Sequence, residues 1–425
     1  MPESFLNFNP SWTLTWAFVL FLIAGTLLRI WLARRQVRHV TLHRNQVPPL
    51  FAQSITLSAH QKAADYTVAK TRMSLVEMAL GSAVLLAWTL LGGLSALNLT
   101  LLSFLGPGMA QQIALLASFV VISGLIDMPL ALYQTFVIED RFGFNKMTFR
   151  LWFIDLIRSS AIGTLVGLPI AALILWLMGA AGNQWWLWAW GVWIGFNLLL
   201  LLIYPTLIAP LFNKFAPLDD ETLKARVTAL MQRCGFAANG LFVMDGSKRS
   251  AHANAYFTGF GAAKRVVFFD TLLAKLLPGE VDAVLAHELG HFKHKHIIKR
   301  IVSMFGLSLL GFALLGWLAA RVWFYDGLGV QPNTDGPNDA LALLLFMLTV
   351  PVFSLFVTPV FALFSRRHEF EADAYAAAQT SGADLANALL KLYVDNASTL
   401  TPDPLYVKFY YSHPAASERL ARITA

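Results

Sequence analysis

Charged residues and cysteines are both scarce in this 425-residue sequence. Asp, Glu, Lys and Arg make up only 13% of it, whereas a soluble domain usually contains about 25%. This shortage, together with 57% hydrophobic residues and a mean hydropathy of +0.58, excludes an ordinary soluble protein and predicts a polytopic membrane protein. The single cysteine, Cys234, excludes an internal disulfide and a zinc cluster built from cysteines.

Long apolar stretches are abundant, and seven of them reach the roughly 20 residues that a helix needs to cross a membrane. We expect spans near Trp12–Ala33, Ser74–Leu97, Ile113–Ile138, Leu151–Met178, Trp185–Tyr204, Ile301–Ala320 and Ala340–Phe364. The sequence therefore predicts a mainly α, polytopic membrane protein with seven transmembrane helices.

Basic residues are concentrated in the loops that follow the odd-numbered spans. Residues 34–73, 139–150, 213–300 and 366–425 contain seven, three, thirteen and six Lys or Arg, whereas the alternate loops contain only Arg321. Because basic loops stay on the cytoplasmic side, this pattern predicts an N-terminus outside and a cytoplasmic C-terminus. Topology in a lipid bilayer accounts for the net charge of +7, so we infer no nucleic-acid partner.

Several ionisable residues fall inside the predicted spans, among them Glu77, Asp127, Asp155 and Arg158. Such groups usually face a protein interior or a water-filled cavity, because contact with lipid is costly. They favour a bundle that is not packed solid. The alternative is that Arg158 pairs with Asp155 as a purely structural contact.

Residues 287–291 read His-Glu-Leu-Gly-His, which fits the H-E-x-x-H pattern of zinc peptidases. Residues four apart share one face of a helix, so His287 and His291 can bind the same ion. Glu288 lies beside them, where its carboxylate can act as the general base toward water. Two surface histidines on an amphipathic helix are the alternative interpretation.

The residues around this motif indicate a small α+β domain. Asp219–Gly235 has the pattern of an amphipathic helix, and Leu241–Met244 and Arg265–Phe269 have the β-branched and aromatic content of strands. Asn254–Phe260 is expected to be extended and to join the second of these strands through a hairpin at residues 261–264. It could bind substrate by strand addition, or it could be an ordinary hairpin strand.

Pro278 and Gly279 are expected to open the helix that carries the zinc motif. Ten residues separate His291 from Ile301, where the sixth span begins, and they would cover about 15 Å as a helix. The metal would then lie close to the membrane face. That position suits a substrate with a lipid or transmembrane part.

A catalytic zinc site needs a third protein ligand. The residues that follow the HELGH motif exclude the third histidine of the metzincin pattern. The extended metzincin pattern requires glycine at 294 and histidine at 297, but the sequence has His294 and Ile297. We expect His294 and His296 to belong to a basic, solvated face near the membrane. Its other members are Lys293, Lys295, Lys299 and Arg300.

The segment Ser365–Ala374 (SRRHEFEADA) provides better candidates for the third ligand. In a helix, Glu369 and Asp373 share a face, whereas Glu371 points about 200° away from Glu369 and is expected to be solvated. One of the two carboxylates would bind zinc and the other would accept the N–H of a ligand histidine. Spacing alone does not decide which one binds the metal. His368 is expected at the surface.

Taken together, these motifs resemble the CAAX prenyl protease family, of the a-factor-converting type, of integral-membrane zinc metalloproteases. The resemblance covers Phe136–Lys146 (FVIEDRFGFNK), Tyr204–Leu218 (YPTLIAPLFNKFAPL), Ser247–Leu273 (SKRSAHANAYFTGFGAAKRVVFFDTLL), HELGH, SRRHEFEADAYA and Tyr411–Leu420 (YSHPAASERL). It extends over most of the chain from the third span onward, and the metal-binding motifs show no departure from the family pattern.

The resemblance implies that one Zn²⁺ ion binds His287, His291 and Glu369, with Glu288 as the general base and acid. It also implies supporting roles for four further residues. Asp373 would be the partner of a ligand histidine, Arg419 would belong to the active-site polar network, and Asn254 and His413 would line the catalytic cleft and contact the substrate backbone or oxyanion. Without the resemblance, His413 is most simply a turn residue before Pro414.

The fold implied by the resemblance has seven long helices that enclose a chamber in the membrane, with a zincin-like zinc domain closing its cytoplasmic end. We expect four segments along the chain. They are residues 1–212 with the first five spans, 213–300 with the HELGH motif, 301–365 with the last two spans, and 366–425, which completes the zinc site.

The leading hypothesis is a membrane-embedded zinc metalloendopeptidase that acts at the cytoplasmic membrane face. Its substrate would be a peptide or protein, lipid-modified or membrane-anchored. One alternative is a general quality-control protease for membrane proteins with no prenyl requirement. Another is a transporter with a structural zinc. A structural zinc usually has four protein ligands where this set supplies three, and the chain has no obvious inverted repeat.

Overall fold

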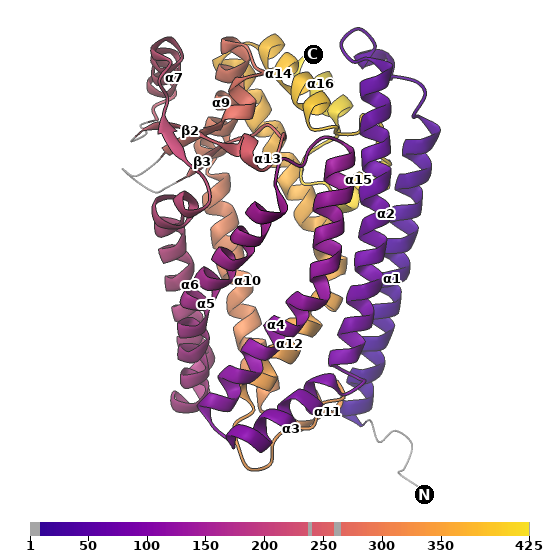
Figure 1. The fold of residues 1–425 in the computed structure, drawn as a ribbon, viewed down its shortest axis with the longest axis vertical. Helices are drawn as coiled ribbons and strands as arrows, with labels where there is room; N and C mark the ends of the chain where they lie inside the picture. Colours follow the sequence, from indigo (N-terminus) through magenta and orange to yellow (C-terminus); the bar gives the residue numbers. More distant parts are fainter. Residues whose placement is uncertain (1–8, 237–239, 259–264, 425) are drawn as a thin grey trace, which may run out of the picture.

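The structure is a computed structural model that describes residues 9–236, 240–258 and 265–424. Long helices run side by side along the molecule, and a small sheet lies at one end of them (Figure 1). The longer helices are α1 Pro10–Leu42, α2 Leu57–Trp88, α3 Gly93–Leu105, α4 Met109–Tyr133, α5 Phe149–Ala180, α6 Trp185–Ile203, α7 Glu221–Arg233, α9 Pro278–Lys293, α10 His296–Ala319, α12 Asp339–Ser354, α13 Thr358–Gln379 and α14 Gly382–Asp395. The shorter ones are α8 Asp270–Leu273, α11 Val322–Asp326, α15 Pro404–Tyr410 and α16 Ala416–Ile423. The prediction of a mainly α chain is confirmed.

Over the described residues, six helical segments are long and apolar enough to cross a membrane. The number becomes seven if α2 and α3, which meet at an angle of 49°, are taken as one bent span. The predicted span Ser74–Leu97 is wrong in its extent, because α2 already ends at Trp88. Gly92 then adopts a φ of +79°, a left-handed conformation that suits glycine, and the chain turns before α3 begins.

The last apolar segment runs directly into the sequence that carries the predicted carboxylate ligand. Helix α12 continues through a 3₁₀ turn at Leu355–Val357 into α13, so that one helical segment of 41 residues extends from Asp339 to Gln379. Glu369 is therefore positioned by a helix that starts inside the membrane-spanning bundle.

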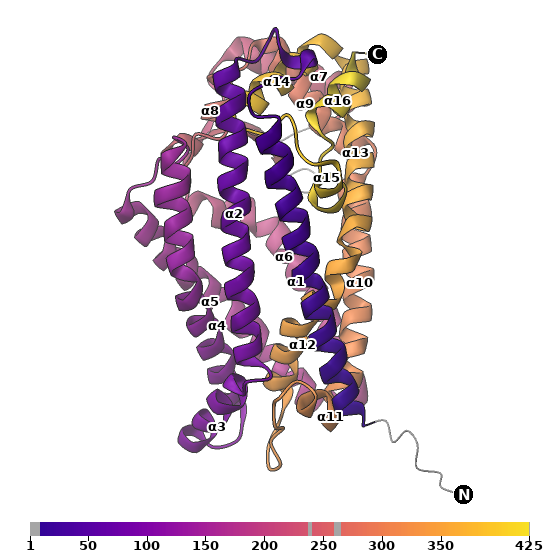
Figure 2. The ribbon, with the colours of Figure 1, turned by 90° about the vertical axis from the view of Figure 1, so that its right-hand side faces the viewer.

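The bundle has a hydrophobic core at the end away from the sheet. Buried side chains from nine helices of the described chain meet there, including Phe18, Leu115, Leu175, Leu315 and Phe324. Both views place α3 and α11 at this end, and α1 and α2 lie side by side along the length of the bundle (Figure 2). In five of the six spanning segments, only 6% to 22% of the residues in the most apolar stretch are buried.

Asp155 in α5 binds Arg249, from the segment that precedes β3, more closely than it binds Arg158. The Nε and Nη2 atoms of Arg249 donate to the two carboxylate oxygens at 2.9 and 3.1 Å. The guanidinium of Arg158 lies 4.0 Å from the same carboxylate and donates to the carbonyl of Leu211 instead. The Asp155–Arg158 pairing is thus not the main contact of Asp155, whose contact with Arg249 ties the sheet end to the bundle.

The small sheet has the strand order β1–β2–β4–β3. Its strands are β1 Phe215–Pro217, β2 Leu241–Met244, β3 Ala255–Thr258 and β4 Arg265–Phe269. β2 and β4 are parallel, and the two outer strands are antiparallel to their neighbours. The predicted strands at 241–244 and 265–269 are confirmed. β3 lies inside the predicted extended stretch, whose hairpin turn at 261–264 lies outside the described residues.

Helix α9 begins where the sequence predicts. Pro278 occupies its first turn, where a missing N–H costs no hydrogen bond, and the carboxylate of Glu280 accepts the backbone N–H of Leu277 at 2.7 Å. The helix packs against α13, and the two lie close together at Gly290. A Cβ atom added there would lie 2.9 Å from the Cα atom of Ala372, so the contact requires glycine.

The chain does not run as one helix from His291 to Ile301, so the length of about 15 Å that a continuous helix would cover does not apply. Helix α9 ends at Lys293, Lys295 adopts a left-handed φ of +57°, and α10 then begins at His296. This break interrupts the helix between the two histidines. His296 then lies within hydrogen-bonding distance of His291, with their Nδ1 atoms 3.0 Å apart.

Candidate active site

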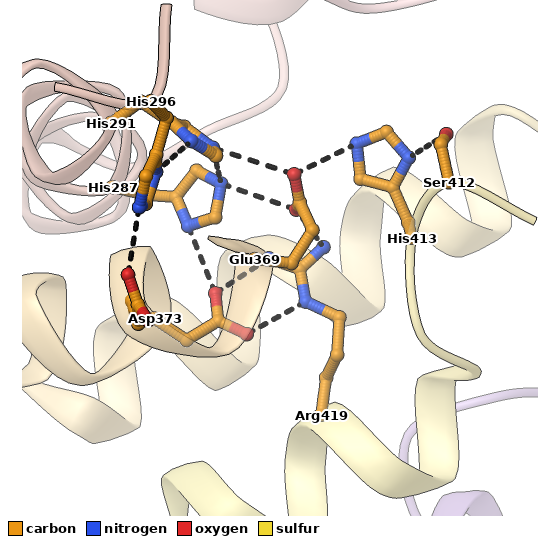
Figure 3. A network of polar contacts seen from close by, with 9 residues as sticks. His287, His291, His296, Glu369, Asp373, Ser412, His413 and Arg419 are labelled. Atoms are coloured by element: carbon orange, nitrogen blue, oxygen red, sulfur yellow. Dashed lines mark hydrogen bonds and ion pairs between the residues drawn. The ribbon is translucent and has the colours of Figure 1, made fainter. Parts of the chain in front are cut away.

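The predicted site residues come from three parts of the chain that meet at the sheet end. Helix α9 supplies His287 and His291, α13 supplies Glu369 and Asp373, and the C-terminal residues supply the rest (Figure 3). His413 lies between α15 and α16, and Arg419 lies in α16. All of these side chains except His413 are at least four-fifths buried.

The side chains of His287, His291 and Glu369 form a triangle in which each faces the other two. The Nε2 atoms of His287 and His291 are 3.3 Å apart. Nε2 of His287 lies 3.5 Å from Oε2 of Glu369, and Nε2 of His291 lies 3.4 Å from Oε1 of Glu369. A tetrahedral zinc ion with bonds of about 2.0–2.1 Å would separate its ligand atoms by about 3.3–3.4 Å. The described residues contain one His, Asp or Glu cluster of metal-binding shape, and it is this one. Its donor set and spacing fit zinc.

The two carboxylates of α13 face different nitrogen atoms. Glu369 faces the Nε2 atoms, whereas Asp373 Oδ1 lies 2.9 Å from Nδ1 of His287. Arg419 holds Asp373 with two hydrogen bonds, from Nε at 2.8 Å and from Nη2 at 2.6 Å. This arrangement keeps the Asp373 carboxylate turned toward His287 and away from the triangle, which the spacing in the sequence could not decide.

Charge pairing in this buried cluster favours ionised groups. Burial alone would raise the pKa of Glu369, but its contacts with His287 and His291 hold it well below the usual range. The pKa of Asp373 is likewise lowered, because the hydrogen bonds from His287 and Arg419 outweigh burial. Burial would lower the pKa of His287, yet its contacts with Asp373 and Glu369 raise it to about 9. The carboxylate Oε2 atom of Glu369 is buried and accepts no hydrogen bond, and its ion pair with Nη1 of Arg419 is loose, at 3.7 Å.

Glu288 carries a carboxylate that makes no hydrogen bond or ion pair within the described part of the chain. It is half-buried on α9, and burial raises its pKa above the ordinary value for glutamate. A carboxylate with a raised pKa and no fixed partner can both accept and return a proton, as a general base and acid must.

His413 and Asn254 differ in how closely they approach the cluster. Nε2 of His413 lies 3.5 Å from Glu369, and its Nδ1 lies 2.9 Å from the hydroxyl of Ser412. Asn254 is exposed just before β3. Its side-chain oxygen accepts the backbone N–H of Ala255, and its carbonyl accepts the N–H of Phe269 on the neighbouring strand β4. The structure thus brings His413, but not Asn254, into direct contact with the ligand set.

His296 and Glu371 are the residues that the sequence did not assign to the site. The expectation that His296 belongs to a solvated face is wrong, because its side chain is only 4% exposed and contacts His291. Glu371 accepts a hydrogen bond from His296 at 2.8 Å instead of being merely solvated. His368 stacks on His296 with a ring separation of 4.0 Å. No sequence pattern reveals the left-handed turn at Lys295 that produces these contacts.

Comparison with known families divides the chain near the end of α6. The model of the CAAX prenyl protease N-terminal region, described as five membrane helices, matches residues 36–214. The model of peptidase family M48 matches residues 217–425, which include every residue of the cluster.

Individual relatives are similar over nearly the whole chain. CAAX prenyl protease 1 of Saccharomyces cerevisiae is 34% identical over 95% of this chain and 93% of its own length. The human CAAX prenyl protease 1 homolog is 31% identical over 95% of this chain and 94% of its own length. The crystal structure of S. mikatae Ste24p superimposes with a TM-score of 0.90 at 31% identity, covering 97% of this chain and 99% of that one. The chain therefore belongs to the CAAX prenyl protease family of M48 peptidases and is a membrane-embedded zinc metalloprotease.

Proposed function

We propose that this protease hydrolyses a peptide bond near the C-terminus of prenylated substrates, at the cytoplasmic face of a membrane, using one zinc ion held by His287, His291 and Glu369. The triangle of these three side chains, whose facing atoms lie 3.3 to 3.5 Å apart, is the observation that carries the proposal. When bound, zinc supplies Lewis-acid chemistry toward water and toward a peptide carbonyl.

The side chains around the triangle have separate proposed roles in proton transfer, in binding of the oxyanion and substrate, and in positioning of His287. Glu288 takes a proton from the attacking water and returns it to the leaving amine nitrogen. His413, which is exposed on its outer side, donates from an imidazole nitrogen to the developing oxyanion. Asn254 stands at the start of the edge strand β3, and we propose that it contacts the substrate backbone alongside that strand. Asp373 and Arg419 fix the ring of His287.

Two adjoining cavities support a substrate with a peptide part and a lipid part. The larger, of about 730 Å³, is lined by His413 and Arg419 and by residues of α2. The smaller, of about 390 Å³, lies between α1, α2 and α12 and has a mainly apolar lining. Ser74 lines both cavities, so they meet at that residue. We propose that the peptide occupies the larger cavity and the prenyl chain the smaller one.

The topology belongs to the same proposal. We propose seven spans that enclose a chamber, with α2 and α3 as one bent span and the sheet end on the cytoplasmic side. The cavities between the helices support a hollow bundle, and the excess of basic residues in loops at the sheet end supports the orientation. Glu77, inside a predicted span, lines the smaller cavity together with Arg29.

Labelling of single cysteines placed at residues 45 and 107, in a chain with Cys234 replaced by serine, would test which end is cytoplasmic.

The four predicted segments, 1–212, 213–300, 301–365 and 366–425, also remain a proposal. The two family models meet between residues 214 and 217, close to the first of these boundaries. Helix α13 crosses the last boundary at residue 365 without a break, so the third and fourth segments would act as one body.

The test uses the purified full chain in detergent with zinc and a matched pair of peptides, one farnesylated at its cysteine and one not. Mass spectrometry of the released fragments reports both the cleavage site and the rate. We expect faster cleavage of the farnesylated peptide and loss of cleavage after chelation. Equal rates for the two peptides would contradict the prenyl requirement and favour a general membrane-protein protease. No zinc-dependent cleavage of either would contradict the proposal as a whole.

A further inference from the structure

We propose that His296 and Glu371 form a hydrogen-bonded relay that positions His291 as a zinc ligand. The proposal rests on the zinc site proposed above. Nδ1 of His291 lies 3.0 Å from Nδ1 of His296, and Nε2 of His296 lies 2.8 Å from Oε2 of Glu371. Figure 3 shows His296 beside His291, on the side away from Glu369.

The carboxylate of Glu371, at the outer end of the relay, determines which nitrogen atoms donate and which accept. An ionised carboxylate only accepts hydrogen bonds, so Nε2 of a neutral His296 must carry its proton and donate it to Glu371. Nδ1 of His296 then has a free lone pair and accepts the N–H on Nδ1 of His291. The lone pair of His291 is left on Nε2, the atom that faces His287 and Glu369. The relay therefore selects the tautomer of His291 that can bind zinc.

The relay is held rigidly on three sides. His296 is 4% exposed, and the ring of His368 stacks on it at 4.0 Å with an interplanar angle of 13°. Glu371 projects from α13, the helix that also carries Glu369. The left-handed turn at Lys295 directs His296 back toward α9. A positioned partner of this kind fixes the ring plane of a ligand histidine as well as its tautomer.

The two histidine ligands are therefore supported in different ways. A carboxylate, Asp373, faces His287 directly at 2.9 Å. His291 instead meets a neutral imidazole, and the carboxylate of Glu371 is one step further away. His296 itself presents no nitrogen to the triangle, because one of its ring nitrogens faces His291 Nδ1 and the other faces Glu371. It is a positioning residue and not a fourth ligand.

The experiment measures zinc binding, which is independent of peptidase activity. In His296→Phe the aromatic ring can still stack on His368, but the hydrogen bond to His291 is lost. We expect its zinc affinity, measured by chelator competition on the full chain in detergent, to fall about 10- to 100-fold. The absorption spectrum of the cobalt-substituted protein should change as well, because the angle of the His291 ring is no longer fixed.

Two matched variants separate positioning from packing. His294→Phe alters a histidine on the same turn that stacks on His296 without a recorded hydrogen bond, and His368→Phe alters only the stacking partner. The zinc affinity of both variants should stay within about threefold of the wild-type value, which is a smaller loss than that expected when the partner of a ligand histidine is removed. Glu371→Gln keeps an acceptor and should retain most of the affinity, whereas Glu371→Ala should lose it.

The outcomes distinguish the relay from the zinc site. Unchanged zinc affinity in folded His296→Phe would overturn the relay, and so would losses in His294→Phe equal to those in His296→Phe. If His296→Phe does not fold, the difference between Glu371→Gln and Glu371→Ala decides, and equal affinities in these two would overturn the relay. If His291→Ala keeps full zinc occupancy, the zinc site itself is wrong, and the relay falls with it.

Discussion

Gly290 of α9 lies directly against Ala372 of α13, so closely that a Cβ atom on Gly290 would stand 2.9 Å from the Cα atom of Ala372. The two helices that carry the proposed zinc ligands are therefore in close contact one residue away from His291. This contact sets the width of the ligand triangle, because any side chain at 290 would push α9 and α13 apart.

Gly290→Ala should destabilise the protein and weaken zinc binding. In an exposed helix interior, glycine to alanine usually gains up to about 1 kcal/mol, but overpacking at a tight contact costs about 1–3 kcal/mol. The thermal midpoint of the metal-free protein and its zinc affinity should both fall. Gly306→Ala in α10, where a Cβ atom would meet nothing within 4 Å, is the control and should be neutral or slightly stabilising. A neutral Gly290→Ala would contradict the close contact.

Glu288→Gln should bind zinc normally and lose hydrolysis. Glutamine keeps the shape of the side chain but cannot accept the proton of the attacking water, a role worth about 10²- to 10⁴-fold in rate. The measurements are zinc content and kcat/KM for a farnesylated peptide. Asp282→Asn removes another carboxylate from the same helix, one that pairs with Arg226 at 2.6 Å, and should leave kcat/KM near the wild-type value. Substantial hydrolysis by Glu288→Gln would rule out this base.

Zinc uptake should become tighter as the pH rises through the neutral range. The contacts with Asp373 and Glu369 raise the pKa of His287 to about 9 against the effect of burial, so the metal-free protein holds this imidazole protonated at neutral pH. Zinc must displace that proton. Below pH 9 the apparent affinity should therefore rise by up to about tenfold for each pH unit.

Chelator competition at several pH values, corrected for the titration of the chelator, measures this slope. Asp373→Asn removes the carboxylate that faces Nδ1 of His287, so its slope should be shallower. An affinity of the wild type that does not change between pH 6.5 and 8.5 would mean that His287 carries no proton to displace.

Periodic and local features of the site were predictable from the sequence, whereas contacts that depend on a break between helices or on long-range packing were not. The spacing of four residues places His287 and His291 on one face of a helix in any structure, and the apolar runs of α4, α5 and α6 indicate their spans. The hydrogen-bonding partner of Asp155 is Arg249, which lies 94 residues away in the sequence, so no local sequence pattern predicts this contact. His296 escaped prediction because a lysine in a left-handed conformation turns the chain, and sequence rules expect glycine there.

Ser74→Trp should discriminate against the lipid part of a substrate. Ser74 lines both cavities, and an indole at this point would obstruct the passage from the peptide cavity to the mainly apolar one between α1, α2 and α12. If two methylene groups of the prenyl chain can no longer be buried, its binding free energy falls by about 1.6 kcal/mol. KM for the farnesylated peptide should therefore rise about tenfold. The unprenylated peptide needs only the larger cavity, and its KM should not change. Val76→Trp, an exposed position of α2 that lines neither cavity, is the control and should affect neither peptide. Equal effects of Ser74→Trp on both peptides would place the prenyl chain elsewhere, because an obstruction between the cavities selects only against a substrate that must occupy both.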